Sequence, residues 1–347
     1  MKVAKALIDQ LETTKVLTKE EWLYLLEHRN ESLSQYLFSH SRAAAQSVFG
    51  NDVYIRGLIE ISNFCKNNCY YCGIRRGNPG VNRYRLSQRE ILQCCLRGYD
   101  LGFRTFVLQG GEDPGFRDED LANTVRIIKE WFPNVAVTLS VGEKSRDVYQ
   151  MFREAGADRY LLRHETYLRS HYESLHPNSM SWERRIQCLE DLKSLGYQVG
   201  TGFMVGSPHQ TNECLAEDLL FIQRFSPQMV GIGPFIPHHQ TPFAKEPAGT
   251  LDLTLFLLGV LRLMNPRLLL PATTALNTIA PQGRQMGILA GANVIMPNLS
   301  PEFACKNYEL YDHKKYSGME NAEAIEKIRN DLAKIGYEIK ISKGDFK

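Results

Sequence analysis

The sequence of 347 residues has neither a long apolar run nor a strong excess of charge. The longest apolar stretch, residues 255–264, is shorter than the roughly 18 residues of a membrane-spanning helix and contains Arg262. The first residues lack the apolar core of a signal peptide. The formal net charge of +2 argues against the concentrated basic surface of a dedicated nucleic-acid-binding protein. We therefore expect a cytoplasmic protein that binds neither membrane nor nucleic acid.

A disulfide framework is also not indicated, because three of the eight cysteines form one short motif. Cys65, Cys69 and Cys72 follow the pattern Cys-x3-Cys-x2-Cys, with an aromatic residue before the third cysteine and a glycine after it. Thiolates this close together are typical of iron–sulfur ligation. A fourth cysteine or histidine at the usual spacing is missing. We interpret the motif as three ligands of a 4Fe–4S cluster with one open iron, with a disulfide pair or a zinc site as the alternative.

The chain divides by pattern into three segments. Residues 1–52 show helical spacing of apolar residues and a capping box at Thr18 and Glu21, which predicts an N-terminal helical extension. Residues 53–300 alternate short apolar runs with amphipathic helices, the pattern of βα units and a parallel sheet. Residues 301–347 are expected to form a C-terminal segment that caps the barrel predicted below, with one helix at residues 322–334 and a short strand-like run at residues 337–341.

Eight apolar runs decide the predicted architecture. Most are followed by a helix, and one of these helices begins at a capping box of Ser87 and Glu90 and should end near Gly102. Eight βα units in succession predict an α/β fold, a (β/α)8 TIM-type barrel with its site at the C-terminal ends of the strands. An open doubly wound sheet is the alternative, because sequence does not show closure. The runs are residues 57–62, 105–109, 136–141, 159–164, 198–205, 229–235, 268–272 and 293–296.

The cysteine motif directly follows the first predicted strand, which places it at the rim of the barrel. After the second strand come Gly110, Gly111 and Glu112, where paired glycines would allow the backbone to approach a ligand. An ordinary turn is the alternative for this stretch. Thr138 and Ser140 share one face of the third strand and could donate hydrogen bonds to a ribose or a carboxylate.

The fourth strand carries an unusual set of charges. Arg159, Leu161, Arg163 and Glu165 share one face, and if Leu161 faces the barrel interior the charged residues do too. Buried charges are costly unless they pair with one another or with ligands, so this face should bind a charged molecule. The opposite parity would direct the arginines towards the helices. Arg185, in the next helix, could reach a carboxylate, although a solvated helix face is the alternative.

The last strands contribute further candidates. Ile232 lies between two glycines and could contact an adenine. Thr273 and Thr274 end the seventh strand and could bind a small anion, with simple helix capping as the alternative. We leave His238 and His239 unassigned, because adjacent residues on a loop rarely bind one metal.

The cysteine pattern resembles the signature of the radical S-adenosylmethionine (SAM) superfamily, and Gly110–Glu112 its Gly-Gly-Glu element. Longer stretches resemble the radical SAM maturase E family of FeFe-hydrogenase, and the likeness covers about residues 50–312. Of these, the stretches in the fourth and sixth strands are the specific ones. They are residues 107–114, 158–166, 229–238, 271–275 and 292–298.

This resemblance implies roles for individual residues. The 4Fe–4S cluster would be bound by Cys65, Cys69 and Cys72. SAM would be contacted by Glu165 and Arg185, beside Thr138 and Ser140. Positions that match the family's substrate-binding, anion-binding end of the barrel are Arg159, Arg163, Thr273, Thr274, Tyr308 and Tyr311.

The resemblance also implies the chemistry. Reductive cleavage of SAM would yield a 5′-deoxyadenosyl radical that acts on an iron–cysteine complex with carbonyl and cyanide ligands, during assembly of the hydrogenase di-iron cofactor. The radical could add to sulfur or abstract hydrogen, and the sequence does not distinguish these. The implied partners are a small anionic substrate, an electron donor such as ferredoxin or flavodoxin, and other hydrogenase maturases.

The chain departs from the family near its C-terminus. Several members hold an accessory cluster there, but here Cys305 stands alone and residues 312–347 contain no cysteine. We therefore expect one cluster. Four further cysteines fall in amphipathic helices and are expected to fill the core: Cys94, Cys95, Cys188 and Cys214.

Other functions remain open. Within the enzymes, the alternatives are a mutase similar to methylornithine synthase, which would share the fold and use anion-binding residues, and a maturase paralogue with another small anionic substrate. Sulfur insertion as in biotin synthase would need a further cysteine on a barrel strand. A non-catalytic iron–sulfur carrier is the alternative from outside the enzymes.

Overall fold

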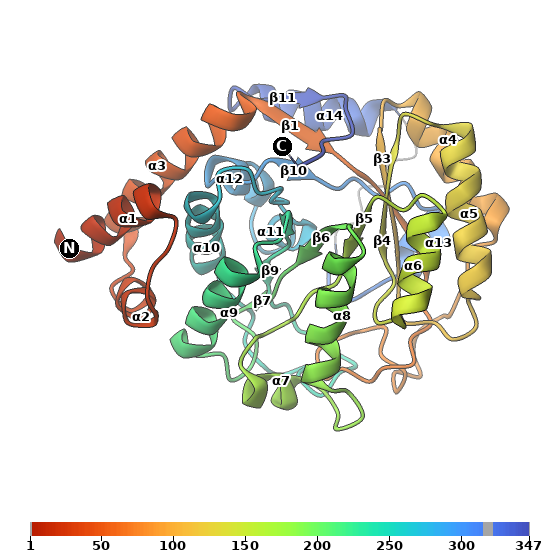
Figure 1. Cartoon of the computed structure of the whole chain (residues 1–347), viewed down its shortest axis with the longest axis horizontal. Coiled ribbons are helices and arrows are strands. Elements are labelled where there is room, and N and C mark those ends of the chain that lie inside the picture. Colours follow the sequence, from red (N-terminus) through yellow and green to blue (C-terminus); the bar gives the residue numbers. More distant parts are fainter. Residues whose placement is uncertain (1, 315–321, 347) are drawn as a thin grey trace.

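The computed structural model describes residues 2–314 and 322–346. Over these residues, none of the helices combines the length and the apolar character needed to cross a membrane. The N-terminal helices lie to one side of a ring of strands and helices (Figure 1).

The strands form a closed parallel ring. Six of them are hydrogen-bonded in the order β2-β3-β4-β5-β6-β8. The ring is completed by parallel bridges from Met229 to Leu269, from Pro271 to Val294 in β10, and from Asn298 back to Leu58 in β2. The predicted barrel is therefore confirmed, and the open doubly wound sheet is wrong. The ring strands are β2 (Gly57–Ser62), β3 (Thr105–Gly110), β4 (Ala136–Ser140), β5 (Arg159–Leu161), β6 (Gln198–Thr201), β8 (Met229–Val230) and β10 (Val294–Ile295).

Two predicted strands are each divided in the structure. β6 and β8 stop where Gly202, with a φ of +156°, brings the backbone against Gly231. A Cβ atom at Gly202 would lie 2.0 Å from the Gly231 carbonyl oxygen, so this approach requires glycine. Beyond it the chain continues as a separate parallel pair, β7 (Met204–Val205) and β9 (Gly233–Pro234).

Strand β10 of the ring is joined to a small separate sheet, which contains one strand from near the N-terminal helices and one from the C-terminal segment. β1 (Asp52–Ile55) pairs in parallel with β10 on one side and with β11 (Glu338–Lys340) on the other. The sequence analysis did not predict β1 as a strand, because both of its partners, β10 and β11, lie far away in the sequence. The C-terminal segment thus adds a strand to the barrel wall. We keep the division at residues 52 and 300 as a proposal.

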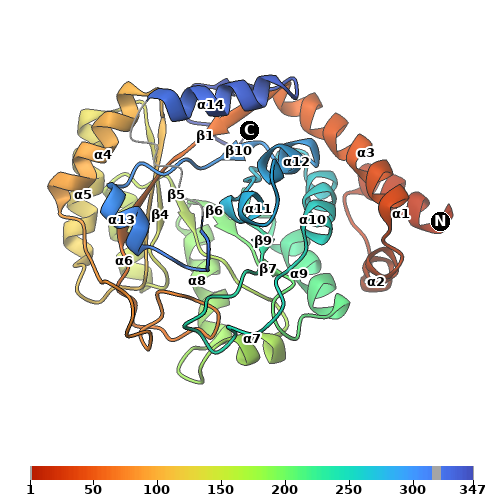
Figure 2. The same ribbon diagram turned by 180° about the vertical axis from the view of Figure 1, so that it is seen from behind.

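The N-terminal helices explain the apolar stretch near residue 255. α1 (Lys2–Thr14), α2 (Lys19–Glu27) and α3 (Glu31–Phe49) stand outside the ring, and α3 lies alongside α10 (Leu251–Met264), as both views show (Figures 1 and 2). α10 is therefore covered on both sides and buried along most of its length. Its Arg262 is also buried and donates to the carbonyl oxygens of Gly291, Pro266 and Leu268.

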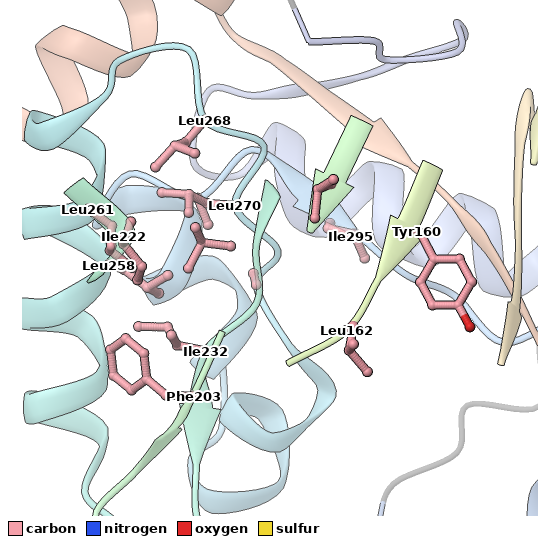
Figure 3. Packing of buried hydrophobic residues seen from close by; sticks show 14 of the residues in the cluster. Tyr160, Leu162, Phe203, Ile222, Ile232, Leu258, Leu261, Leu268, Leu270 and Ile295 are labelled. Atoms are coloured by element: carbon pink, nitrogen blue, oxygen red, sulfur yellow. The ribbon is translucent and has the colours of Figure 1, made fainter. Parts of the chain in front are cut away.

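The remaining helices surround the barrel. Apolar residues of α9 and α10 meet the outer face of the strands, where Ile222, Leu258 and Leu261 lie near Phe203 and Ile232 (Figure 3). The predicted capping boxes at Thr18 and Ser87 are confirmed. These helices are α4 (Gln88–Asp100), α5 (Asp118–Trp131), α6 (Arg146–Glu154), α7 (Arg169–Leu175), α8 (Trp182–Ser194), α9 (Asn212–Phe225), α11 (Thr274–Ile279), α12 (Gly283–Leu289), α13 (Glu302–Asn307) and α14 (Ala322–Ala333).

Candidate functional site

The three motif cysteines lie in the irregular loop between β2 and α4, which we call the cluster loop (residues 63–86). Hydrogen bonds to backbone groups hold its shape. The Asn63 side chain donates to the carbonyl oxygens of Asn82 (2.9 Å) and Asn307 (2.7 Å). The Arg83 guanidinium donates to the carbonyl oxygens of Ile74 and Arg75, both at 2.7 Å. Side chains thus substitute for the strand and helix bonds that this loop lacks.

The donor atoms of Cys65, Cys69 and Cys72 fit a cluster better than a zinc ion. Tetrahedral zinc would bring thiolate sulfurs within about 3.8 Å of one another, since each Zn–S bond is about 2.3 Å. Within the described residues, these three sulfurs are not among the ligand groups gathered within 4.8 Å. Burial raises the pKa of the Cys72 thiol to about 12 and also raises the pKa values of the other two, so bound metal is needed to hold thiolates here.

The Gly-Gly-Glu stretch packs directly on the cluster loop. A Cβ atom at Gly111 would lie 2.2 Å from the Phe64 carbonyl oxygen, and the Gly111 N–H donates to the Ser62 carbonyl oxygen (3.1 Å). Position 111 therefore requires glycine, because the two loops approach each other too closely for a side chain. Glu112 is buried, and its carboxylate lies 3.3 Å from the Lys66 ammonium and 3.8 Å from the Arg185 guanidinium.

Arg185 joins these elements at the rim of the barrel. It lies in α8, is 7% exposed, and donates to the Glu143 carboxylate (2.7 Å) and the Arg163 carbonyl oxygen (2.9 Å). Burial alone would lower its pKa, but the nearby Tyr172, Glu143 and Glu112 outweigh burial and raise it. The solvated-helix alternative for Arg185 is therefore wrong. Glu143 was missed by the sequence analysis, because it follows β4 in a loop with no recognisable pattern.

The parity predicted for the fourth strand is confirmed. Tyr160 packs against Tyr149 of α6 with ring centroids 5.0 Å apart, Leu162 belongs to the same buried apolar cluster (Figure 3), and His164 lies 3.1 Å from Asp218 of α9. The alternate residues therefore face the interior, where the side chains of Arg163 and Glu165 are 3.1 Å apart.

This interior ion pair is incompletely satisfied. Among the described residues, Arg163 Nε and Nη2 and Glu165 Oε2 are buried without a hydrogen-bond partner. Glu165 also has a φ of +66°, which a residue with a Cβ rarely adopts. Strained backbone and buried polar atoms without a hydrogen bond are typical of ligand sites, since a ligand supplies the missing contacts.

Hydroxyl groups continue the polar lining of the interior. Thr138 Oγ1 and Thr273 Oγ1 are buried and have no hydrogen-bond partner in the part of the chain that the structure describes. Thr273 precedes α11, but its side chain makes no capping bond within the described residues, so the capping alternative does not explain it. Ser140 is half-buried at the end of β4. Thr274 opens α11, where its carbonyl oxygen accepts a bond from Thr278 (3.1 Å).

Arg159 is not at the rim, which corrects the prediction that it binds substrate with Arg163. It begins β5, at the opposite end of the barrel, and is fully buried. Its guanidinium donates to the Lys343 carbonyl oxygen (2.8 Å) and to the Asp345 carboxylate (2.6 Å). The C-terminal tail therefore already supplies the anion that we expected from a ligand.

Ile232 also differs from its prediction. Its side chain is fully buried on the outer face of the strands beside Phe203 (Figure 3). The neighbouring Gly233 has the opposite orientation, since a Cβ there would lie 2.9 Å from Thr273 Oγ1. Because side chains alternate along a strand, the Ile232 side chain points away from the interior. Any contact with an adenine would have to come from the backbone of Ile232.

Residues 307–314, which we call the strap, cross the rim of the barrel. The Gly73 N–H of the cluster loop donates to the Leu310 carbonyl oxygen (2.8 Å). Lys314 forms an ion pair with the fully buried Glu60 of β2 (2.5 Å), a pair that the sequence analysis missed. Tyr308 is buried and Tyr311 half-buried in the strap.

Two further features lie close to the strap or α11 but are not assigned to the site. His238, His239 and Asp312 place their ligand atoms within 4.8 Å of one another. However, His238 Nδ1 accepts the Gln240 N–H (3.1 Å), so its Nε2 carries the proton and is not free to bind a metal. A cavity of about 480 Å³ lies between α12 and α14, beside Arg284, and none of the predicted site residues borders it.

The buried cysteines agree with their predicted structural role. Cys94, Cys95, Cys188 and Cys214 are each at most 2% exposed.

Comparison with known proteins agrees with this geometry. Residues 59–222 match the family model described as the Radical SAM superfamily. The chain is 43% identical over 310 residues to the FeFe hydrogenase maturase subunit HydE of Thermotoga maritima. The aligned residues cover 89% of this chain and 88% of that protein.

A second group of relatives has a different printed activity. The chain is 29% identical over 300 residues to the 3-methylornithine synthase of Methanosarcina barkeri, covering 85% of this chain and 83% of that protein. A crystal structure of methylornithine synthase (PylB) superposes with a TM-score of 0.82 at 26% identity, covering 96% of this chain and 97% of that one.

Proposed function

Because the chain belongs to the radical SAM superfamily and, within it, to the family of the FeFe-hydrogenase maturase HydE, we propose that it cleaves SAM reductively during maturation of this hydrogenase. The product would be a 5′-deoxyadenosyl radical that acts on a small anionic iron–cysteine complex with carbonyl and cyanide ligands. The observation that carries this proposal is the unsatisfied Arg163–Glu165 pair inside a barrel whose rim holds three cysteines.

Cys65, Cys69 and Cys72 would hold one 4Fe–4S cluster. Such a cluster, bound by three cysteines, would bind SAM and would supply the electron for its reductive cleavage. The residues of the chain would orient SAM and exclude water. Glu165 Oε2 is in ion-pair contact with Arg163 but makes no hydrogen bond among the described residues, so it could accept from an ammonium or hydroxyl group. Arg185 lies at the same rim, where it donates to the Arg163 carbonyl oxygen. Further contacts would come from Gly110, Gly111, Glu112, Thr138, Ser140 and the backbone of Ile232.

The substrate would lie deeper in the interior than SAM. Arg163 offers two buried N–H groups and Thr273 one hydroxyl, and these donors suit an anionic complex. Thr274 is the neighbour of Thr273 at the start of α11, and Tyr308 and Tyr311 would close the cavity from the strap. Arg159 is left out of this set, because Asp345 neutralises it.

The electron would come from a small acidic carrier protein such as ferredoxin or flavodoxin. Residues 61–86, which include the cluster loop, contain five basic residues and no acidic residue, and Arg76 is exposed there. Turnover driven by such a carrier should therefore slow when the salt concentration is raised. It should also slow in the Arg76→Glu variant, while turnover driven by dithionite stays unchanged. Arg126→Glu, on the exposed face of α5, is the matched control. Equal losses in both variants would exclude this docking surface.

Anaerobic reconstitution with iron, sulfide, SAM and dithionite tests the activity. We expect 5′-deoxyadenosine from the wild-type protein and none from Cys69→Ala. Formation of 5′-deoxyadenosine by Cys69→Ala would contradict the cluster assignment, and its absence from the wild type would favour the non-catalytic carrier.

The similarity to methylornithine synthase supports a second candidate, a mutase that acts on an amino acid, whose carboxylate would be the anionic group that the site binds. Both candidates cleave SAM, so substrate decides between them. The reconstituted protein should consume SAM faster with an iron–cysteine carbonyl/cyanide complex than with L-lysine. The reverse order would favour the mutase.

A further inference from the structure

The turn between α7 and α8 packs directly against the cluster loop. The Tyr70 N–H donates to the Leu175 carbonyl oxygen (3.0 Å), and Met180 Sδ lies 3.6 Å from Cys69 Sγ. Between these contacts, the Tyr71 hydroxyl lies 3.0 Å from His176 Nε2. Three successive residues of the motif therefore touch one short segment, residues 175–180.

The hydrogen bonds of His176 determine which nitrogen carries its proton. His176 Nδ1 lies 2.8 Å from the Tyr172 carbonyl oxygen, which can only accept a bond. Nδ1 must therefore carry the proton, and in the neutral ring Nε2 is an acceptor. It follows that the Tyr71 hydroxyl donates to His176.

The surroundings keep this arrangement intact over a wide pH range. His176 is 2% exposed, and burial together with the positive charge of Arg185 lowers its pKa to about 3. His176 thus stays neutral, with one donor nitrogen and one acceptor nitrogen.

The position of Tyr71 gives the pair a role. Tyr71 lies in the sequence between Cys69 and Cys72, two of the proposed cluster ligands. Its ring meets His176 edge-on, with centroids 5.4 Å apart, and His176 in turn stacks on Tyr172 at 4.0 Å. A side chain held in this way is fixed within the motif that carries the cysteines, next to which the proposed function places SAM.

We propose that His176 is a positioning residue for the SAM site, which fixes the Tyr71 side chain by accepting its hydroxyl hydrogen bond. This inference rests on the proposed function, since it assumes that SAM binds beside the three cysteines. His176 itself touches neither the cysteines nor the interior charges in the contacts found within the described residues. It acts through Tyr71.

Four variants test the proposal: His176→Leu, His176→Gln, Tyr71→Phe and the double variant Tyr71→Phe/His176→Leu. Each is loaded with iron and sulfide, and its iron content and its Kd for SAM are measured, the latter from the change in the electron paramagnetic resonance spectrum of the reduced protein. Loss of one buried hydrogen bond that orders the site should weaken SAM binding about tenfold in His176→Leu. Iron content should remain that of the wild type.

Coupling between the two residues gives the decisive result. If they act as one unit, the Kd of the double variant for SAM should not exceed the larger of the two Kd values of Tyr71→Phe and His176→Leu. His176→Gln should stay within about threefold of the wild type, because an amide can also donate to the Tyr172 carbonyl and accept from Tyr71. His171→Leu is the matched control, since His171 is a buried histidine of the preceding helix α7 that contacts Thr166 and the Pro208 carbonyl instead.

Two outcomes would overturn the proposal. One is wild-type SAM affinity in His176→Leu, and the other is fully additive losses in the double variant. A readout on the iron-free protein separates this inference from the proposed function. The same double-mutant cycle on urea unfolding should show coupling between Tyr71 and His176 even if the wild type forms no 5′-deoxyadenosine, whereas additive unfolding effects would also refute the pairing.

Discussion

Replacing Asp345 by asparagine should destabilise the protein without changing SAM cleavage. The Arg159 guanidinium is fully buried and donates to Asp345 (2.6 Å), the Lys343 carbonyl oxygen (2.8 Å) and Thr105 Oγ1 (3.1 Å). Asparagine can keep an oxygen acceptor at this point but removes the negative charge. The change therefore isolates the electrostatic part of the contact.

The expected size follows from the exposure of the two partners. A hydrogen bond to a charged group contributes about 1.5–3 kcal/mol, and one between neutral groups about 0.5–1.5 kcal/mol. Because the Asp345 side chain is 46% exposed, solvent screens part of this difference. We expect a loss of about 1 kcal/mol for Asp345→Asn and about 2 kcal/mol for Asp345→Ala, which also removes the acceptor.

Urea unfolding of the iron-free protein, followed by circular dichroism, measures this loss. Glu326→Gln is the control, because its ion pair with Arg329 joins two exposed residues of one helix and should contribute less than about 0.5 kcal/mol. 5′-Deoxyadenosine formation by both variants should equal that of the wild type. Unchanged stability in Asp345→Ala, or a selective loss of SAM cleavage, would refute the assignment of Arg159 to the tail.

Three further predictions concern the rim of the barrel. Glu165→Gln should raise the Kd for SAM at least tenfold with iron content unchanged, because it removes the interior negative charge; equilibrium binding measures this. Lys314→Met should lower the free energy of unfolding by about 2–4 kcal/mol, since it leaves buried Glu60 without its cation; an unchanged urea midpoint would contradict it. Hydrogen bonds from Arg85 and Ser62 outweigh burial and lower the pKa of Asp113, so the stability from this carboxylate is present above its unfolded pKa and is lost as pH falls through the folded one. Asp113→Asn should therefore flatten the decline in stability below about pH 4, and an unaltered acid profile would disprove this.

Local patterns were sufficient for several features of this protein. The capping boxes at Thr18 and Ser87 depend on residues three apart, and the structure contains both. Strand alternation placed Arg163 and Glu165 on one face, because side chains on a strand have a period of two residues. Eight βα runs predicted a barrel, and the closing bridges, such as Leu58 to Asn298, confirm it.

Position along a strand could not be predicted in the same way. Arg159 and Arg163 share a face, but four residues of extended chain separate them by about 13 Å. Arg159 thus meets the C-terminal tail while Arg163 lies beside Glu165. Nothing near Arg159 in the sequence indicates Asp345, because that contact depends on how the last residues cross the barrel floor.

The sequence by itself determined the cysteine motif, the βα order and the face that each strand residue occupies, since all of these are set by neighbours within a few positions. Only the tertiary structure decided which polar side chains meet: Glu60 with Lys314, Arg159 with Asp345, and Tyr71 with His176. These partners come from segments far apart in the chain. Their pairing depends on packing of the whole barrel, which no local pattern encodes.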